Sequence, residues 1–436
     1  MPPRKQTIWT EAQAERKLRS LELFGMRFGL DRMRRMMTVL GSPERRFSAV
    51  HVLGTNGKSS TTRMTAAILQ RHGLRTAAYL SPHLVSYRER VLIDGCEMDT
   101  RAFAAAVARA SWAAERVNRT LAGDDHVTQF ELLTAAALWE MARQEVDVAV
   151  IEAGLGGRYD ATSVIRAPVT VLTNVGLEHT RWLGPTITDI AEEKLAAVQA
   201  GAALVLGVDL APAALEVAKR VAHERRAQIV RPGPAPDADS LLARGAFQQR
   251  NFQAARAAAE AYLAIAGIAL SERCVAQAGA ATDVPGRLQL IDCDPPTALD
   301  GAHNPDAVCA LVQSLPDALP EGPLALVLGV LEDKDAAAML ASLLPVAARA
   351  WFTAPPSSRA LSPGALQSLA RQQGFEDSVC EPQPAPALEQ ARGWAAAHGG
   401  AVLVTGSVYL VGDLLGKLAG SGTLALSRAS PESRGG

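Results

Sequence analysis

The sequence predicts an α/β fold with a mostly parallel central sheet, followed by a second, smaller α/β domain. Along the 436 residues, short apolar segments alternate with longer segments that have a helical pattern. Continuous apolar strands separated by helices are typical of a parallel sheet covered on both faces. Several of these strands end in polar or glycine-rich sequence, and ligands in such sheets bind beyond the carboxyl ends of the strands. We therefore expect the functional residues at the strand ends.

Five apolar segments predict the strands of the first domain, and three segments between them predict helices. The strands are expected at 48–54, 76–81, 146–154, 168–176 and 203–208, and the helices at 61–73, 130–145 and 189–201. A proline-rich stretch, 231–240, reads as a loop within this domain.

A second series of apolar segments follows a boundary near 286–296, where glycine and proline cluster. Its strands are expected within 296–304, 323–330, 348–355 and 401–410. We therefore divide the chain into an N-terminal α/β domain (1–290), a smaller C-terminal α/β domain (291–425) and a disordered tail (426–436).

Composition excludes several classes of protein. Hydrophobic residues make up 48% and charged residues 20% of the chain, which is ordinary globular composition. A net charge of −1 gives no basic surface for nucleic acid. Since no run approaches ~18 apolar residues, we expect no membrane partner. The first 25 residues are charged and lack an apolar core, so we expect no secretory signal.

The five cysteines are scattered and form no C-x-x-C pair. This pattern favours neither a disulfide framework nor a zinc site, and it fits a cytoplasmic protein. No coiled-coil pattern is present, so a monomer is expected.

The segment VLGTNGKSS, from Val52 to Ser60, resembles a phosphate-binding loop but is shorter than the usual one. The pattern G-x-x-x-x-G-K-[ST] requires glycine where Val52 stands. The context nevertheless fits, because a strand precedes the segment and a helix follows it. Backbone N–H groups at a helix N-terminus attract anions, and Lys58 would add positive charge. The alternative is a Gly–Asn turn before a surface helix.

Ser81 and His83 lie at the end of the second predicted strand. A site at the sheet edge would place a metal-coordinating hydroxyl there, and Arg88 and Arg90 could hold an anionic substrate. The alternative is a loop before a charged edge strand.

Glu152 follows four apolar residues and is expected at the carboxyl end of a strand. A carboxylate in that position is costly unless it is paired or bound to a cation. Because Mg²⁺ prefers oxygen ligands and bridges phosphates, Glu152 beside a phosphate loop predicts a magnesium site. A turn with a solvated glutamate is the alternative.

His179 and Lys194 follow the next predicted strand. We expect Lys194 on a helix that begins with Thr188 or Asp189 as N-cap. A loop imidazole and an exposed Glu–Lys pair are the alternatives. In the second domain, Asp300 and His303 could contact a nucleotide, although each alone fits an ordinary strand–loop–helix junction.

Together these motifs resemble the Mur ligase superfamily and, within it, the folylpolyglutamate synthase family with its bifunctional dihydrofolate synthase members. The similarity runs from about residue 20 to 415, and the family's short loop, G-T-x-G-K, accounts for Val52. The motifs occur in the family's order: GTNGKSS (54–60), SPHL (81–84), GLGGRYDAT (154–162), EHT…LG (178–184), EEK (192–194), PGR (285–287), DGAHNP (300–305) and TGS (405–407).

The resemblance implies ATP bound between the two domains, with Mg²⁺. It implies catalytic roles for Lys58, Glu152, His179 and Lys194. It places the nucleotide against Gly54, Thr55, Asn56, Gly57, Lys58, Ser59, Ser60, Asn251, Arg287, Asp300 and His303. Metal ligands would be Ser81, Glu152, His179 and Lys194, the last if CO₂ carbamylates it. The pterin substrate would contact Ser81, Pro82, His83, Arg88, Asp160 and Ala161.

The chain departs from the family pattern in four places. It has GKSS where GKGS is common, DATS (160–163) where DATN is usual, and LAAV after Lys194. Phe247 stands where the family has a histidine before the QQRN segment. These differences leave the nucleotide and metal residues intact and concern the details of folate contact.

The resemblance implies an ATP-dependent ligase that adds L-glutamate to folates, and also to 7,8-dihydropteroate, through an acyl phosphate. Asp160 favours both activities, because it matches a residue close to the pterin. One alternative is a Mur-type ligase acting on a UDP-linked cell-wall precursor. Another is a nucleotide-binding regulatory protein without turnover, which the presence of Lys58, Glu152, His179 and Lys194 disfavours.

Overall fold

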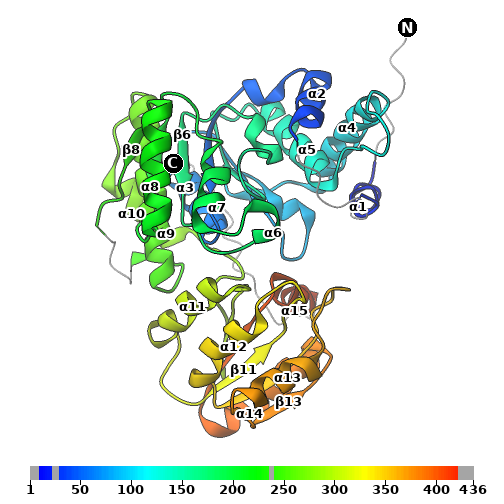
Figure 1. The fold of residues 1–436 in the computed structure, drawn as a ribbon, viewed down its shortest axis with the longest axis vertical. Helices are drawn as coiled ribbons and strands as arrows, with labels where there is room; N and C mark the ends of the chain where they lie inside the picture. The colour runs from blue at the N-terminus through cyan, green and yellow to red at the C-terminus, as the bar shows by residue number, and fades with distance from the viewer. Residues whose placement is uncertain (1–8, 22–28, 235–239, 421–436) are drawn as a thin grey trace, which may run out of the picture. The chain divides into compact units, whose positions relative to one another are not determined.

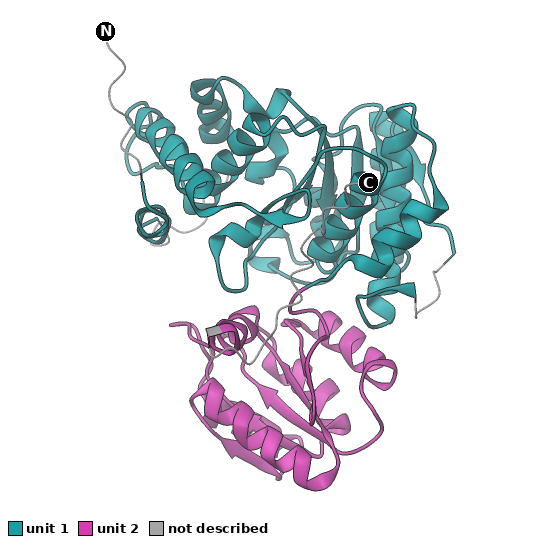
Figure 2. Cartoon of the chain, turned by 180° about the vertical axis from the view of Figure 1, so that it is seen from behind, with its two compact units in different colours: residues 1–284 teal, residues 285–436 magenta. Residues whose placement is uncertain are grey.

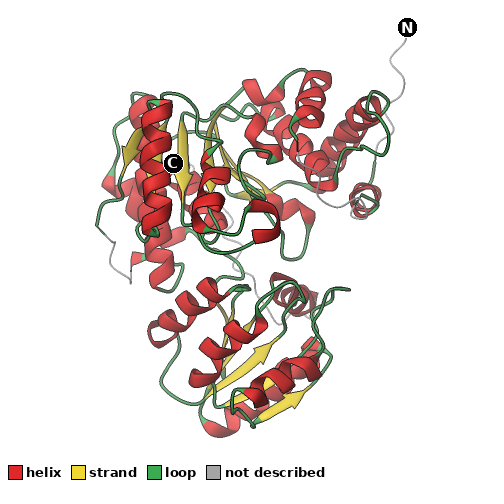
Figure 3. Ribbon diagram, in the orientation of Figure 1, coloured by secondary structure: helices red, strands yellow, loops and turns green. Residues whose placement is uncertain are grey.

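The computed structural model describes residues 9–21, 29–234 and 240–420, and the tail predicted at 426–436 lies outside them. The chain divides into two units, 1–284 and 285–436, which Figure 2 shows in different colours. Each unit has its own β-sheet covered by helices (Figure 3), so the α/β class is confirmed.

The first unit contains an eight-stranded sheet with the order β4-β3-β2-β5-β1-β6-β7-β8. The pairs from β2 through β8 are parallel, and β3 runs antiparallel to both of its neighbours. The bounds are β1 (Ser48–Leu53), β2 (Thr76–Tyr79), β3 (Val91–Ile93), β4 (Cys96–Glu97), β5 (Val148–Glu152), β6 (Val169–Leu172), β7 (Ala203–Leu206) and β8 (Gln228–Val230). The carboxyl ends of β2, β5, β1 and β6 therefore meet at one edge.

Side chains of the central strands alternate between two apolar layers. Ala49 and Ile151 pack with α2, α4 and α5, whereas Val50 and Val150 pack with α3, α9 and α10. Figure 1 labels these helices. The helices are α1 (Glu11–Arg19), α2 (Asp31–Leu40), α3 (Lys58–Arg71), α4 (Thr100–Asn118), α5 (Gln129–Arg143), α6 (Thr180–Leu183), α7 (Ile187–Leu195), α8 (Pro212–Arg225), α9 (Ala246–Ile265) and α10 (Glu272–Ala281).

The helix that carries Lys194 begins earlier than predicted. Thr186 is its N-cap, and Asp189 is the third helical residue, whose side chain accepts a hydrogen bond from the Thr186 N–H. This reciprocal capping box satisfies two backbone donors, which explains why the N-cap prediction of Thr188 or Asp189 is wrong. The helix ends at Leu195 rather than near 201.

A buried ion pair ties α2 to the start of α5. Arg32 Nε lies 3.0 Å from Glu131 Oε1, and the two side chains are only 7% and 6% exposed. We expect Glu131→Ala to lower the free energy of unfolding by roughly 3–5 kcal/mol, because it leaves the buried Arg32 guanidinium with Asp125 as its remaining partner and also breaks the capping box with Thr128. Urea titration would measure the change.

The matched control is Glu15→Ala, since Glu15 pairs with a side chain of Arg19 that is 66% exposed. Exposed pairs contribute roughly 0–1 kcal/mol. Equal losses in the two variants would contradict the importance of the buried pair.

The second unit contains a six-stranded sheet with the order β13-β12-β11-β14-β10-β9, parallel except for β9. Its strands are β9 (Gln289–Cys293), β10 (Pro296–Leu299), β11 (Leu324–Leu328), β12 (Arg349–Phe352), β13 (Ser378–Cys380) and β14 (Ala401–Thr405). Its helices are α11 (Pro305–Ala318), α12 (Ala336–Leu343), α13 (Pro363–Gln372), α14 (Pro384–His398) and α15 (Val408–Gly420). Among the described helices of either unit, none has the length and apolarity needed to cross a membrane.

Candidate active site

The loop between β1 and α3 requires glycine at two positions. Gly57 has φ of 80°, and a Cβ there would lie 2.3 Å from Asn251 Oδ1. A Cβ on Gly54 would lie 1.9 Å from Thr173 Oγ1. Asn251 therefore packs against this loop, and the chain can approach a ligand closely only because both glycines lack side chains.

Two residues that the sequence did not single out hold the loop in place. Asn174 Oδ1 accepts hydrogen bonds from the N–H groups of Thr55 (3.2 Å) and Asn56 (2.8 Å). The Thr173 hydroxyl donates to Asn56 O over 2.7 Å. Both residues directly follow β6, the strand next to β1, so their position at a strand end was the available signal.

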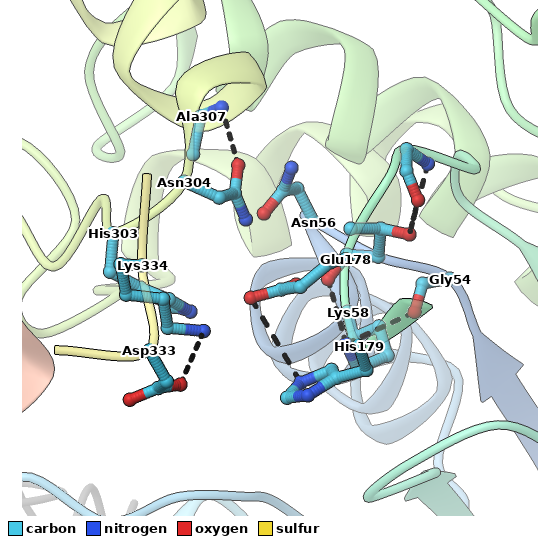
Figure 4. A network of polar contacts seen from close by, with 12 residues as sticks. Gly54, Asn56, Lys58, Glu178, His179, His303, Asn304, Ala307, Asp333 and Lys334 are labelled. Atoms are coloured by element: carbon cyan, nitrogen blue, oxygen red, sulfur yellow. Dashed lines mark hydrogen bonds and ion pairs between the residues drawn. The ribbon is translucent and has the colours of Figure 1, made fainter. Parts of the chain in front are cut away.

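Lys58 opens α3 and folds back over the loop. Its Nζ donates to Gly54 O (3.1 Å) and Thr55 O (2.8 Å), as Figure 4 shows for Gly54. The amine is therefore held beside the N-terminus of a helix whose N-cap is Gly57. Positive charge beside the N-terminus of a helix favours the binding of an anion such as phosphate.

Glu152 lies at the carboxyl end of β5 and is 1% exposed. Its Oε1 accepts from the Ser59 hydroxyl (3.0 Å), and its Oε2 accepts from the Ser81 N–H (3.1 Å). The alternative of a solvated glutamate is therefore wrong. Within the ranges that the structure describes, no three His, Cys, Asp or Glu side chains form a metal-binding cluster. A cation here would draw on one carboxylate, hydroxyls and the oxygens of a ligand.

Lys194 is buried, at 4% exposure, rather than part of an exposed Glu–Lys pair. Its Nζ donates to Gly54 O over 2.7 Å, so this carbonyl accepts from both Lys58 and Lys194. Burial, followed by the positive charge of Lys58, lowers the pKa of the Lys194 amine to about 7. A large fraction of the amine is therefore neutral near physiological pH.

The lowered pKa of Lys194 predicts a pH dependence of stability. Between about pH 7, its folded pKa, and 10.5, its ordinary value, the unfolded chain binds more protons than the folded chain. The free energy of unfolding should therefore rise with pH across this window, and the penalty is full below pH 7. Urea titrations at several pH values should show this rise for the native chain and a flatter profile for Lys194→Met. Identical profiles would contradict the buried neutral amine.

His179 is the N-cap of α6 and has a φ of 54°. Its Nε2 lies 3.9 Å from Glu178 Oε1, the pair drawn in Figure 4. The negative charge of Glu178 also acts on Lys194 and opposes the lowering of its pKa. Glu178 is thus an acidic residue close to His179 and Lys194. We did not predict it as a site residue, although it is the first residue of the EHT motif.

The loop from 154 to 163 is packed between α5 and α7. A Cβ on Gly154 would lie 2.5 Å from the Phe130 ring, and one on Gly157 would lie 2.1 Å from Lys194 O. Asp160, 5% exposed, accepts hydrogen bonds from the N–H groups of Leu155 (2.6 Å) and Thr162 (2.9 Å). Burial raises the pKa of its carboxyl group.

The segment 81–90 begins with a cis Ser81–Pro82 bond and includes His83, whose imidazole ring contacts Arg90 and Tyr87. Arg90 Nε donates to His83 Nδ1 over 3.0 Å, and the ring centroids of His83 and Tyr87 are 4.3 Å apart. Burial, then the charge of Arg90, lowers the pKa of His83 to about 3. A neutral His83 therefore carries its proton on Nε2, where it can donate to a ligand.

Arg88 takes part in contacts within the unit. Its Nε lies 2.7 Å from Glu11 Oε1 of α1, and its Nη1 donates to Met98 O over 3.2 Å. The guanidinium thus joins α1 to the segment after β4.

In the second unit, the DGAHN loop follows β10. Asp300 accepts from the N–H groups of Leu288 and Ala302, both at 2.7 Å, and burial raises the pKa of its carboxyl group despite the charge of Arg287. His303 Nδ1 donates to Gly301 O over 2.7 Å, which leaves Nε2 as the acceptor of the neutral ring.

The same loop begins α11 and contacts the TGS motif. Asn304 Oδ1 accepts from the Ala307 N–H over 2.9 Å and caps the helix (Figure 4). The Gly406 N–H donates to Ala302 O over 3.0 Å. Lys334 Nζ lies 3.7 Å from Asp333 Oδ2 in the same figure. Asn304 and Lys334 are polar residues near this loop that the sequence did not single out.

Comparison with known proteins matches both units to family models. Residues 52–253 match the Mur ligase middle domain, and residues 286–408 match the Mur ligase, glutamate ligase domain. The dihydrofolate synthase/folylpolyglutamate synthase of Escherichia coli is 33% identical over 406 residues, which is 89% of this chain and 90% of that protein. The folylpolyglutamate synthase of Mycobacterium tuberculosis, complexed with ADP, superposes with a TM-score of 0.87 at 31% identity and covers 93% of this chain and 98% of its own.

A longer relative also matches. A probable bifunctional folylpolyglutamate synthase/dihydropteroate synthase of Haloferax volcanii is 35% identical over 422 residues, covering 90% of this chain. The chain spans about half the length of that protein, 49%.

Proposed function

Because this chain belongs to the folylpolyglutamate synthase/dihydrofolate synthase enzymes of the Mur ligase family, we propose that it joins L-glutamate both to folates and to 7,8-dihydropteroate. It is an ATP-dependent ligase. A UDP-linked cell-wall substrate has less support than a folate substrate. Relatives that match about nine-tenths of this chain are named for folate activities, as dihydrofolate synthase/folylpolyglutamate synthase.

The observation that carries the proposal is the group of Lys58, Ser59 and Glu152 at the carboxyl edge of the first sheet. A phosphate loop with its lysine lies beside a buried carboxylate bonded to a hydroxyl. The carboxylate and hydroxyl oxygens fit Mg²⁺, which prefers oxygen ligands. We propose Ser81, Glu152 and His179 as its protein ligands, together with Lys194 if that amine is carbamylated. When bound, Mg²⁺ would neutralise charge on the phosphates.

The reaction forms an amide from a carboxylate, which is a poor electrophile. Transfer of the γ-phosphoryl group to the substrate carboxylate gives an acyl phosphate and ADP. The amine of L-glutamate then attacks the acyl carbon, and phosphate leaves. Lys58 and the N–H groups at the start of α3 would hold the phosphates in line, so positioning and charge stabilisation supply the catalysis without a protein nucleophile.

The remaining roles belong to the same proposal. Asn251 contributes to the nucleotide site through its contact with Gly57. Arg287, Asp300 and His303 would bind nucleotide from the second unit. Residues 81–83, Arg88, Asp160 and Ala161 would contact the pterin substrate, with His83 Nε2–H as a donor.

We further propose that CO₂ carbamylates Lys194. The reaction requires a neutral amine, and the pKa of about 7 leaves about half of the amines neutral at pH 7. The product would be an anion with oxygen ligands for a metal. We expect a protein carbamate signal in ¹³C NMR under ¹³CO₂ at neutral pH, and its loss in Lys194→Arg. A signal that persists in Lys194→Arg would contradict this assignment.

An ADP-release assay tests the function. Purified protein with ATP, Mg²⁺ and L-glutamate should release ADP when dihydropteroate or tetrahydrofolate is added. Release with only one of them would restrict the chain to a single activity. Release with a UDP-linked peptide precursor instead would favour the cell-wall alternative, and nucleotide binding without release would favour the regulatory one.

We place the reaction in the cytoplasm and the enzyme as a monomer. The five cysteines, all of them within the described ranges, are free, which fits a reducing compartment.

A further inference from the structure

A buried histidine lies three residues before the phosphate loop. His51 is on β1 and is 2% exposed. Its Nε2 lies 2.8 Å from the hydroxyl oxygen of Thr162, a residue 111 positions further along the chain. His51 therefore joins the strand that leads to the phosphate loop to the loop that contains Asp160.

The chain of contacts continues from Thr162 to Asp160. The Thr162 hydroxyl lies 2.5 Å from Asp160 Oδ1, and the Thr162 N–H donates to the same oxygen over 2.9 Å. The other oxygen accepts from the Leu155 N–H over 2.6 Å. Three hydrogen bonds thus converge on the Asp160 carboxyl group, and they oppose the rise in its pKa that burial causes.

These contacts fix the direction of the bonds. The Thr162 hydroxyl has one proton, and Asp160 Oδ1, which also accepts from the Thr162 N–H, is its acceptor. Thr162 therefore donates to Asp160, and its oxygen accepts from His51, so His51 must carry a proton on Nε2. Burial lowers the pKa of His51 to about 4, which keeps the ring neutral at physiological pH.

We propose that His51 and Thr162 are positioning residues for the pterin substrate, which act through a directed hydrogen-bond chain, His51 Nε2–H to Thr162 Oγ–H to Asp160. The inference rests on the proposed contact of Asp160 with the pterin. The chain fixes the orientation of the Asp160 carboxylate and, through it, the loop from 154 to 162.

The loop from 154 to 162 also contacts α7, the helix that carries Lys194. Its Gly157 packs against the backbone carbonyl of Lys194, and the Arg158 N–H donates to Glu193 O over 3.0 Å. The buried His51 therefore links β1, which leads to the phosphate loop, to the loop 154–162, and that loop packs against α7, the helix of Lys194.

The tautomer of His51 is tested without any assay of activity. In ¹⁵N-histidine-labelled protein, long-range ¹H–¹⁵N spectra distinguish Nε2–H from Nδ1–H rings, and His51→Gln identifies the His51 signal by its loss. We expect a neutral ring with the proton on Nε2 from neutral pH down to about pH 5. A ring protonated on Nδ1, or charged at pH 7, would overturn the directed chain.

The positioning role is tested with Thr162→Val, which keeps the shape of the side chain but removes its hydroxyl. We expect KM for dihydropteroate to rise roughly tenfold, because a buried carboxylate loses a donor, with KM for ATP unchanged. Thr162→Ser should restore the native KM. The control is Thr65→Val, which removes another buried threonine hydroxyl, bonded to Thr61 O over 2.7 Å, in α3.

Native KM for dihydropteroate in Thr162→Val, with a melting temperature lowered as in Thr65→Val, would show a structural role alone and overturn the proposal. An equal rise of KM for ATP would do the same. Failure of the native chain to use dihydropteroate would instead contradict the proposed function, and the spectra would still decide the direction of the chain.

Discussion

Lys58→Ala should reduce kcat/KM for ligation roughly a thousandfold, because it removes the cation that stabilises charge on the transferred phosphoryl group. The amine donates hydrogen bonds to Gly54 O and Thr55 O of its own loop, so the variant should fold. Steady-state ADP release with dihydropteroate and L-glutamate would measure the loss. Nucleotide affinity, from calorimetry, should fall as well.

The control for this variant is Lys219→Ala. Lys219 pairs with Glu216 on the exposed surface of α8, so its loss should leave kcat/KM unchanged. Full ligase activity of Lys58→Ala would remove the phosphate assignment of the loop.

Glu152→Gln should lower kcat roughly a hundredfold or more and raise the Mg²⁺ concentration needed for half-maximal rate, because the amide lacks the charge that binds a cation. The side chain keeps its size, and the Ser59 hydroxyl can still form a hydrogen bond with it. Rates measured across a Mg²⁺ titration would separate metal affinity from the rate at saturation.

Glu140→Gln is the matched control. Glu140 is a fully buried glutamate near the C-terminal end of α5, where it pairs with Arg143. It should change stability but not the Mg²⁺ dependence. A native Mg²⁺ dependence in Glu152→Gln would place the metal elsewhere.

Features that depend on residues close together in the sequence were predictable. The strand, short glycine loop and helix around Lys58 are local, and so is the position of Glu152 at a strand end. The start of the helix of Lys194 was predicted too late, because Thr186 and Thr188 both precede Asp189 and either can serve as an N-cap. Thr186 is the N-cap, since it is the threonine that forms a reciprocal capping box with Asp189.

Features that depend on the packing of distant segments were not predictable in the same way. Lys194 reads as a surface lysine on its own helix, yet it reaches Gly54 O, 140 residues earlier in the chain. Asn174 and His51 contribute through partners more than 100 positions away, and no local pattern marks either of them. Nor does any local pattern show that Arg88 pairs with Glu11 of the first helix.

If this enzyme activates a carboxylate as an acyl phosphate, one carboxylate oxygen must leave with the phosphate. Dihydropteroate with ¹⁸O in its carboxylate is incubated with ATP, Mg²⁺ and L-glutamate, and the released phosphate is analysed by mass spectrometry. The account predicts one ¹⁸O atom in each phosphate formed during ligation, because the bridging oxygen leaves with phosphorus. Phosphate without ¹⁸O, released while the amide forms, would contradict it.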